Sequence, residues 1–155
     1  MGKKFASAGK LLGRPPHKVR RSIQQDNYSC GAHVCLTALR LFRRTKIPTA
    51  NRLMVLLGTT KRYGTEDAAI ITYLRMRGLT VSESRRMRWT DLKIAVSRKK
   101  VVVATVDDDH YALVHGIDDE YVYLSDPAVG RCAGRAQTIR EFQSRFSKAG
   151  FAIGT

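Results

Sequence analysis

The chain has 155 residues, of which 43% are hydrophobic and 26% are charged, values typical of one soluble globular domain with a core of its own. Lysine and arginine number 28 against 13 aspartate and glutamate residues, so the formal net charge is +15 and the sequence pI is near 10.3. No stretch is apolar over the length of a membrane-spanning helix, which excludes a protein that crosses the bilayer by helices.

The excess positive charge is already evident in the first 21 residues, which carry lysine and arginine but no acidic residue. We expect residues 1–21 to form a flexible basic tail and residues 22–155 to form the folded domain. The alternative function for this tail is an arm that binds nucleic acid or a membrane surface. The charge of the whole chain likewise predicts an anionic partner for a basic surface, without indicating which one.

Three cysteines, Cys30, Cys35 and Cys132, are an odd number and cannot all pair within one chain. We therefore expect all three to be reduced, which indicates a reducing compartment and a cytoplasmic location. The basic N-terminus agrees with this location, because no apolar run follows it as it would in a secretory signal.

Cys30 lies where a polar, turn-forming run ends and an apolar helical pattern begins, within residues 24–36. A thiol in the first turn of a helix lies in the positive end of the helix dipole, which favours the thiolate. Gly31 and Ala32 are small, so we expect another backbone or a substrate to approach the sulfur closely. Gln24, six residues earlier, can direct its side-chain amide toward the space beside the sulfur.

Three more helices are expected before residue 101. Thr49 is the expected N-cap of residues 50–57, and Thr65 is the expected N-cap of a helix that Gly78 ends. A short strand over residues 79–82 follows. Arginines at positions 85, 86 and 88 then precede Trp89, which we expect to be buried beside a solvated loop, and Thr90 is the expected cap of the next helix.

From residue 101 the hydrophobic period changes to that of strands. Residues 101–106 form a continuous apolar run, which predicts a central strand, and residues 110–117 and 121–124 follow after tight turns. Thr138 and Glu141 form a capping box for a last helix, and residues 151–153 are expected to return as an edge strand. Helices first and antiparallel strands after them predict an α+β fold.

A cysteine nucleophile needs a histidine to share its proton and a group to hold that histidine. Of the four histidines, His110 is the best placed, because it begins a strand just after a polar turn. His17 lies in the tail, His33 lies one turn along the Cys30 helix, and His115 lies on the opposite face of the His110 strand. Asp126 ends the next strand, and antiparallel pairing brings it beside His110.

Three motifs together resemble the bacteriocin-processing cysteine peptidases, the C39 family of peptidases with a papain-like fold. They are Gln-x5-Cys-Gly at residues 24–31, the His-Tyr-Ala-Leu-Val-His-Gly run at residues 110–116, and Ser-Asp-Pro at residues 125–127. The residues around Thr65 and the helix from Thr138 are also similar to that family, so the resemblance covers about residues 22–153.

The resemblance implies a nucleophilic Cys30, His110 as base and acid, Asp126 as the orienting carboxylate and Gln24 as the oxyanion donor. It also implies cleavage after a Gly-Gly pair in a leader peptide, without a cofactor. Many members are fused to a transporter, and this chain resembles the stand-alone group, which has no transporter segment. Ser29 stands where many members have aspartate.

Two hypotheses from other classes remain open at this point. One is a non-catalytic module that holds a peptide in the same cleft or nucleic acid on its basic surface. The other is a metal site formed by Cys30, His33, Cys35 and His110. We expect Cys35 and Cys132 to have structural roles and His115 to be either structural or at the surface. The tyrosines at positions 121 and 123 are expected to pack on the sheet.

Overall fold

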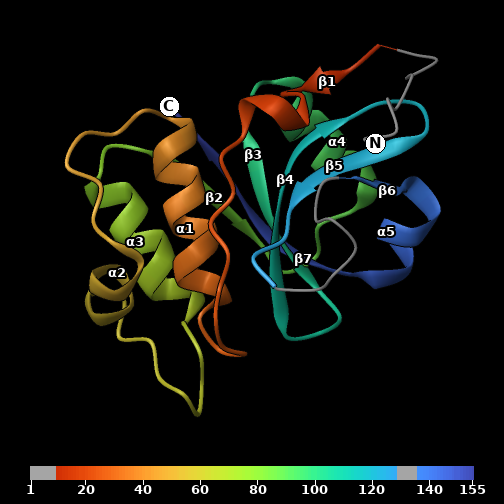
Figure 1. The fold of residues 1–155 in the computed structure, drawn as a ribbon. Coiled ribbons are helices and arrows are strands. Elements are labelled where there is room, and N and C mark those ends of the chain that lie inside the picture. Colours follow the sequence, from red (N-terminus) through yellow and green to blue (C-terminus); the bar gives the residue numbers. More distant parts are fainter. Residues whose placement is uncertain (1–9, 129–135) are drawn as a thin grey trace.

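The computed structural model describes residues 10–128 and 136–155. Within these residues, seven strands form one antiparallel sheet, five α-helices pack on its two faces, and a short 3₁₀ helix lies near the N-terminus (Figure 1). The fold is therefore α+β, as the order of helical and strand patterns predicts. No helix of the described part is both long and apolar enough to cross a membrane.

Three consecutive strands form the part of the sheet that carries the site. They are β3 (Val101–Val106), β4 (His110–Ile117) and β5 (Tyr121–Ser125). Both pairings are antiparallel: Val106 pairs with His110 at one end, and Leu113 pairs with Ser125. The expected hairpins are thus confirmed, and the start of β4 lies near the end of β5.

The other strands complete the order β2-β7-β3-β4-β5-β6, with β1 added beside β4. The prediction that residues 151–153 form an edge strand is wrong, because β7 is long and pairs with β2 on one side and with β3 on the other. Its interior place lets Phe151 and Ile153 be buried almost completely. The bounds are β2 (Thr80–Ser84), β6 (Ala136–Thr138) and β7 (Phe146–Gly154).

Both faces of the central strands are buried, which explains the continuous apolar run of β3. Val101 and Val103 belong to one core cluster, whereas Val102, Ala104 and Val106 belong to the other. Successive side chains of a strand point to opposite faces, so helices on both faces require apolar residues at every position. The continuous run therefore predicts the central place of β3 correctly.

Helices α1, α2 and α3 cover one face of the sheet (Figure 1). Thr49 caps α2 by accepting a hydrogen bond from the Arg52 N–H, as predicted. The prediction that Thr65 caps α3 is wrong: the N-cap is Glu66, and the Thr65 hydroxyl instead bonds the hydroxyl of Thr59 at 2.7 Å. The bounds are α1 (Cys30–Leu41), α2 (Ala50–Leu56) and α3 (Asp67–Met76).

Helices α4 (Trp89–Ser97) and α5 (Ile139–Arg145) pack on the opposite face. The prediction that Thr90 caps α4 is wrong, because the N-cap is Arg88, which forms a capping box with Asp91. The capping box of α5 is present as predicted from its sequence. Trp89 is half-buried rather than buried, and its ring lies 6.0 Å from that of Phe142.

The segment before residue 22 contacts the sheet. Strand β1 (Leu12–Gly13) pairs with the end of β4, and the Arg14 N–H donates to the carbonyl of His115 at 2.7 Å. Gly116 permits this contact, because a Cβ there would lie 2.5 Å from the Arg14 carbonyl oxygen. A 3₁₀ helix (Pro16–Lys18) follows.

The flexible tail expected through residue 21 therefore does not include β1 and the 3₁₀ helix. Backbone pairing with β4 holds β1 to the sheet, and the composition of the segment gave no sign of it. The part of the expected tail over residues 1–9 lies outside the described residues.

Candidate functional site

The turn before α1 fixes the position of Cys30. The Asp26 carboxylate accepts hydrogen bonds from the backbone N–H groups of Tyr28 at 2.9 Å and Ser29 at 2.7 Å. Burial raises the pKa of Asp26, but the hydrogen bonds from these residues outweigh it and hold this pKa below its ordinary value. This aspartate therefore organises the entry to α1, and Cys30 begins the helix with 8% of its surface exposed.

Gly31 packs against α3 and the segment before it. A Cβ on Gly31 would lie 2.7 Å from Cβ of Thr65 and 3.0 Å from Cδ1 of Ile70. The small size of Gly31 therefore lets the N-terminal turn of α1 approach the start of α3. The approach of a substrate to the sulfur stays a prediction.

His110 and Asp126 come together at the end of the sheet, 2.7 Å apart between Nε2 and Oδ1. The carboxylate is 1% exposed, and the N–H of Ala128 also donates to Oδ1 at 2.9 Å. Burial raises the pKa of Asp126, but the bonds with His110 and Ala128 and the positive charge of Arg145 reverse this effect and lower it. Asp126 is thus a buried carboxylate that stays ionised.

His110 also interacts with the Cys30 thiol. Burial lowers the pKa of His110, but the hydrogen bond to Asp126 and the hydrogen bond and charge of Cys30 outweigh it and raise the pKa to about 9. The ring is consequently protonated near neutral pH. Because Nε2 faces Asp126, Nδ1 is the ring nitrogen left for exchange with another group.

Gln24 connects the turn before α1 to the end of β5. Its backbone N–H donates to the carbonyl of Pro127 at 2.8 Å, and its side-chain Nε2 donates to the carbonyl of Asp26 at 2.6 Å. The side chain is 3% exposed. One amide hydrogen is therefore used within the turn, and the other is available to an acceptor in the neighbouring pocket.

Three of the four residues that the sequence singles out line one pocket of about 420 Å³, namely Gln24, Cys30 and His110. Asp126 lies behind His110 and is covered by it. A second pocket of about 420 Å³ lies between α1 and α2 and shares Gln25 and Asp26 with the first. Segments distant in the sequence thus place a thiol, an imidazole and an amide on one cavity.

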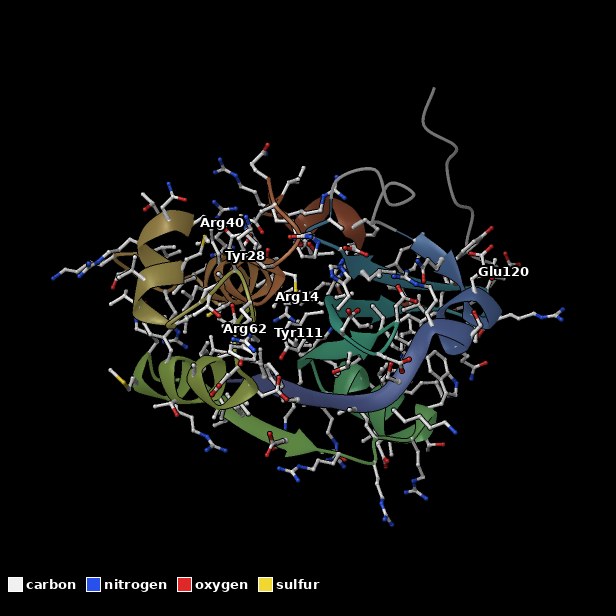
Figure 2. All side chains as sticks on the ribbon, turned by 90° about the horizontal axis from the view of Figure 1, so that it is seen from below. Arg14, Tyr28, Arg40, Arg62, Tyr111 and Glu120 are labelled. Carbon is white, nitrogen blue, oxygen red and sulfur yellow. The ribbon has the colours of Figure 1, made fainter. Side chains whose placement is uncertain are left out.

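Two groups near the site were missed from the sequence. Arg145, at the end of α5, contacts both Asp107 and Asp126. Tyr111 is labelled in Figure 2. Its hydroxyl bonds the carboxylate of Asp67 on α3, so that this residue of β4 is tied to the helical face. Neither contact has a signal in the sequence, because the partners are 19 or more residues apart and belong to different elements.

The remaining histidines and cysteines have other surroundings. The Nδ1 atom of His33 lies 2.7 Å from the hydroxyl of Ser22, and burial lowers the pKa of His33. His115 is 2% exposed, and its Nδ1 lies 2.8 Å from the carbonyl of Arg14. Cys35 is fully buried, and burial raises the pKa of its thiol to about 12. The His17 side chain and Cys132 are outside what the structure describes.

These positions bear on the metal hypothesis. The thiol of Cys35 lies in the core, and the Nδ1 atom of His33 is bonded to Ser22, so the four residues of this alternative hypothesis do not converge. Throughout residues 10–128 and 136–155, no group of three histidine, cysteine or acidic residues has the arrangement of a metal site.

Comparisons with known proteins agree with the fold. The model of the peptidase C39 family matches residues 18–153. An uncharacterized protein of Methanothermobacter thermautotrophicus is 34% identical over 113 residues, which cover 70% of this chain and 72% of that protein.

Two solved structures are similar. A double glycine motif protease from an AMS/PCAT transporter, solved in complex with the leader peptide, has a TM-score of 0.75 and 20% identity, covering 94% of this chain and 98% of that chain. The peptidase domain of Streptococcus ComA, a bi-functional ABC transporter involved in a quorum sensing pathway, has a TM-score of 0.72 and 17% identity, covering 87% and 97%. At these identities, the two structures support the papain-like α+β fold.

Proposed function

Because the chain belongs to the peptidase C39 family, we propose that it is an active cysteine peptidase in which Cys30 is the nucleophile, His110 the base and acid, and Asp126 the orienting carboxylate. The observation that carries this proposal is the pocket that Cys30 shares with His110, whose ring is bonded from behind by Asp126. These groups come from the start of α1, the start of β4 and the end of β5, which are distant in the sequence.

In the proposed reaction, His110 holds the proton and the Cys30 sulfur reacts as a thiolate. The thiolate attacks the scissile carbonyl carbon, so that a C–S bond forms and the carbonyl π pair moves to oxygen. His110 then gives its Nδ1 proton to the leaving amine as the C–N bond breaks. Water attacks the resulting thioester and gives a proton to His110, and cleavage of the C–S bond restores the thiolate.

Two donors can stabilise the oxyanion. The first backbone N–H groups of α1 have no carbonyl partner within the helix, and the N–H of Cys30 is one of them. The second donor is the amide hydrogen of Gln24 that Asp26 does not use. We assign the oxyanion hole to these two groups, because both adjoin the pocket that contains the sulfur.

The proposed substrate class draws on a similar protein. The similar AMS/PCAT protease was solved with a leader peptide, and we propose that this chain likewise cleaves after a Gly-Gly pair at the end of a leader segment. Two glycines without side chains can approach the buried Cys30 and His110 closely.

A library of Gly-Gly peptides incubated with the wild-type protein, Cys30→Ala and Cys35→Ala tests the proposal by mass spectrometry of the products. We expect cleavage by the wild type and by Cys35→Ala, which removes a buried thiol outside the pocket, and none by Cys30→Ala. Cleavage by all three would indicate a contaminating peptidase. Binding of a peptide without cleavage by the wild type would overturn the proposal in favour of a non-catalytic module.

A further inference from the structure

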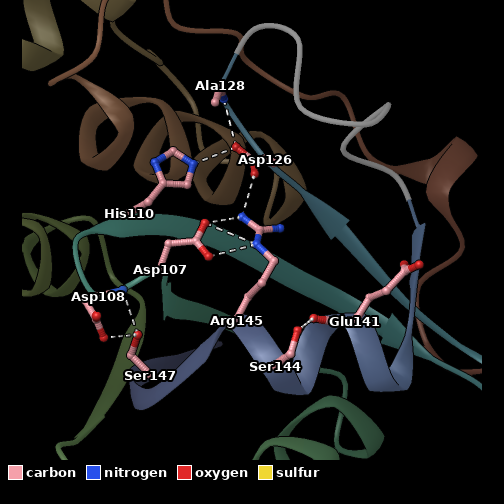
Figure 3. A network of polar contacts seen from close by, with 9 residues as sticks. All are labelled: Asp107, Asp108, His110, Asp126, Ala128, Glu141, Ser144, Arg145 and Ser147. Carbon is pink, nitrogen blue, oxygen red and sulfur yellow. Dashed lines mark hydrogen bonds and ion pairs between the residues drawn. The ribbon is translucent and has the colours of Figure 1, made fainter.

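Arg145 joins two acidic side chains at the edge of the site. Its guanidinium contacts the Asp107 carboxylate in a two-pronged arrangement, with Nη2 to Oδ2 at 2.8 Å and Nε to Oδ1 at 3.1 Å (Figure 3). The same Nη2 lies 3.7 Å from Oδ2 of Asp126. Arg145 ends α5, Asp107 follows β3, and Asp126 follows β5, so one side chain connects three elements.

The carboxylate of Asp126 needs this cation. Its Oδ1 contacts His110 and the N–H of Ala128, whereas its buried Oδ2 has no hydrogen-bond donor among the described residues. Burying an ionised oxygen without compensation is costly. Arg145 supplies the nearby positive charge on this side. Arg21 contacts Asp126 as well, through Nη1 to the backbone carbonyl at 3.5 Å.

Asp107 holds the guanidinium in place. The backbone N–H of Asp107 donates to the carbonyl of Arg145 at 2.8 Å, so the two residues are tied through both main chain and side chain. Immediately before Asp107, Val106 pairs with His110 across the β3–β4 hairpin. The fork between Arg145 and Asp107 therefore fixes α5 relative to the turn that presents His110.

These contacts form a row of alternating charges. The row runs from the His110 imidazolium to the Asp126 carboxylate, the Arg145 guanidinium and the Asp107 carboxylate. Each charge lies next to two of the opposite sign, except at the ends. Such an arrangement stabilises every member, because attraction between neighbours exceeds repulsion between the more distant like charges.

We propose that Arg145 is a positioning residue of the peptidase, which holds the Asp126 carboxylate against His110, and that Asp107 fixes Arg145 for this purpose. The inference rests on the proposed function, because positioning matters to catalysis only if the Cys30–His110 pair acts. Arg145 differs from an exposed ion pair such as Arg88–Asp91, whose arginine side chain is 79% exposed, because its own side chain is 19% exposed and Asp126 is 1% exposed.

Kinetics of Arg145→Met, Arg145→Lys and Arg88→Met test the proposal. Arg145→Met keeps an aliphatic side chain without the cation, and we expect kcat to fall by roughly tenfold or more with KM nearly unchanged. Arg145→Lys keeps the charge without the fork and should retain an intermediate kcat. Arg88→Met removes another arginine–aspartate pair, on α4, and should leave kcat unchanged. Equal kcat for wild type and Arg145→Met would overturn the proposal.

Titration of the His110 ring by NMR, with histidine labelled by nitrogen-15, gives a readout that does not need cleavage. In the wild type we expect a midpoint near the pKa of about 9, and in Arg145→Met a decrease of about one pH unit or more, because Asp126 no longer bonds the ring as closely. If Arg145 acted on His110 only through its charge, Arg145→Met would leave the midpoint unchanged or raise it slightly, because a cation near the imidazolium is then lost.

The two experiments separate the hypotheses. A decrease in the midpoint of Arg145→Met supports positioning even if no peptide is cleaved, in which case the proposed function alone fails. An unchanged or higher midpoint in a folded Arg145→Met protein overturns the positioning role, whatever its activity. Asp107→Asn offers a milder second variant if Arg145→Met does not fold, and it should lower the midpoint in the same direction.

Discussion

At the residue scale, two partners from different elements determine the pKa of His110. Asp126 contacts Nε2 from the end of β5, and Cys30 approaches from the start of α1. Burial alone would lower the pKa of His110 and favour a neutral ring. The partners reverse that effect, so the protonated ring persists above neutral pH.

We expect kcat/KM to fall as the pH rises through about 9, because His110 then loses the proton that the leaving amine needs. The pKa of Asp126 is held below its ordinary value, so this carboxylate stays ionised even when the pH falls to the range in which an ordinary aspartate titrates. In Asp126→Asn, the alkaline limb should move to lower pH, since an amide does not favour the imidazolium. The measurement is a pH profile of kcat/KM for both proteins.

His115→Gln is the matched control for that profile. His115 does not line the pocket, and burial lowers the pKa of its ring to about 4, so it does not titrate near the alkaline limb. Its substitution should leave the limb in place. An alkaline limb that Asp126→Asn does not move would contradict the role of Asp126 in holding the His110 proton.

At the element scale, the position of α1 depends on its contact with α3. Gly31 lies directly after the proposed nucleophile, and its missing side chain allows Thr65 and Ile70 to lie against the helix. The first turn of α1 is therefore fixed from one side by α3 and from the other by the Asp26 turn. Cys30 takes its position from these two contacts.

Gly31→Ala should lower the free energy of unfolding by about 1–3 kcal/mol, because the added methyl group has no space beside Thr65. We also expect kcat to decrease, since the helix can relieve the clash only by moving its first turn. Urea unfolding and kinetics of the same sample measure the two effects. In a double-mutant cycle, Thr65→Gly should reduce the cost of Gly31→Ala, and additive costs would show that the two residues are not coupled.

At the scale of the whole molecule, one antiparallel sheet separates two groups of helices, and the site lies where its strands end. Helix α1, one of the three helices on one face, supplies Cys30. Helix α5 supplies Arg145 from the other face (Figures 1 and 3). His110 and Asp126 belong to the sheet between them. The row of charges thus connects the sheet to α5 at the site.

The net charge of +15 predicts weak, sequence-independent binding of an anionic polymer. We expect fluorescence anisotropy to detect binding to a DNA duplex of arbitrary sequence, with an affinity that falls steeply between about 50 mM and 200 mM salt. A duplex of unrelated sequence is the control and should bind equally well. Absence of binding at the lower salt concentration would remove the anionic partner that the composition predicts.

The sequence by itself determined most of the elements and their order, although it gave no signal for β1 or β6. Helical spacing after Cys30 and the strand-like apolar runs from residue 101 come from local burial patterns, which need no knowledge of the partner elements. The hairpin between β4 and β5 also follows from a short turn, and it brings Asp126 to His110 without further information. The candidate site was therefore predictable as far as short-range pairing extends.

Only the tertiary structure decided the interior place of β7, the direction in which Gly31 packs and the contact of Arg145 with Asp126. Each depends on which surfaces of distant elements meet. An apolar strand can pair on either edge of a sheet, and an arginine at a helix end is equally favourable in solvent. The choice comes from burying both faces of one sheet at once, a condition on the whole chain that no local stretch of residues contains.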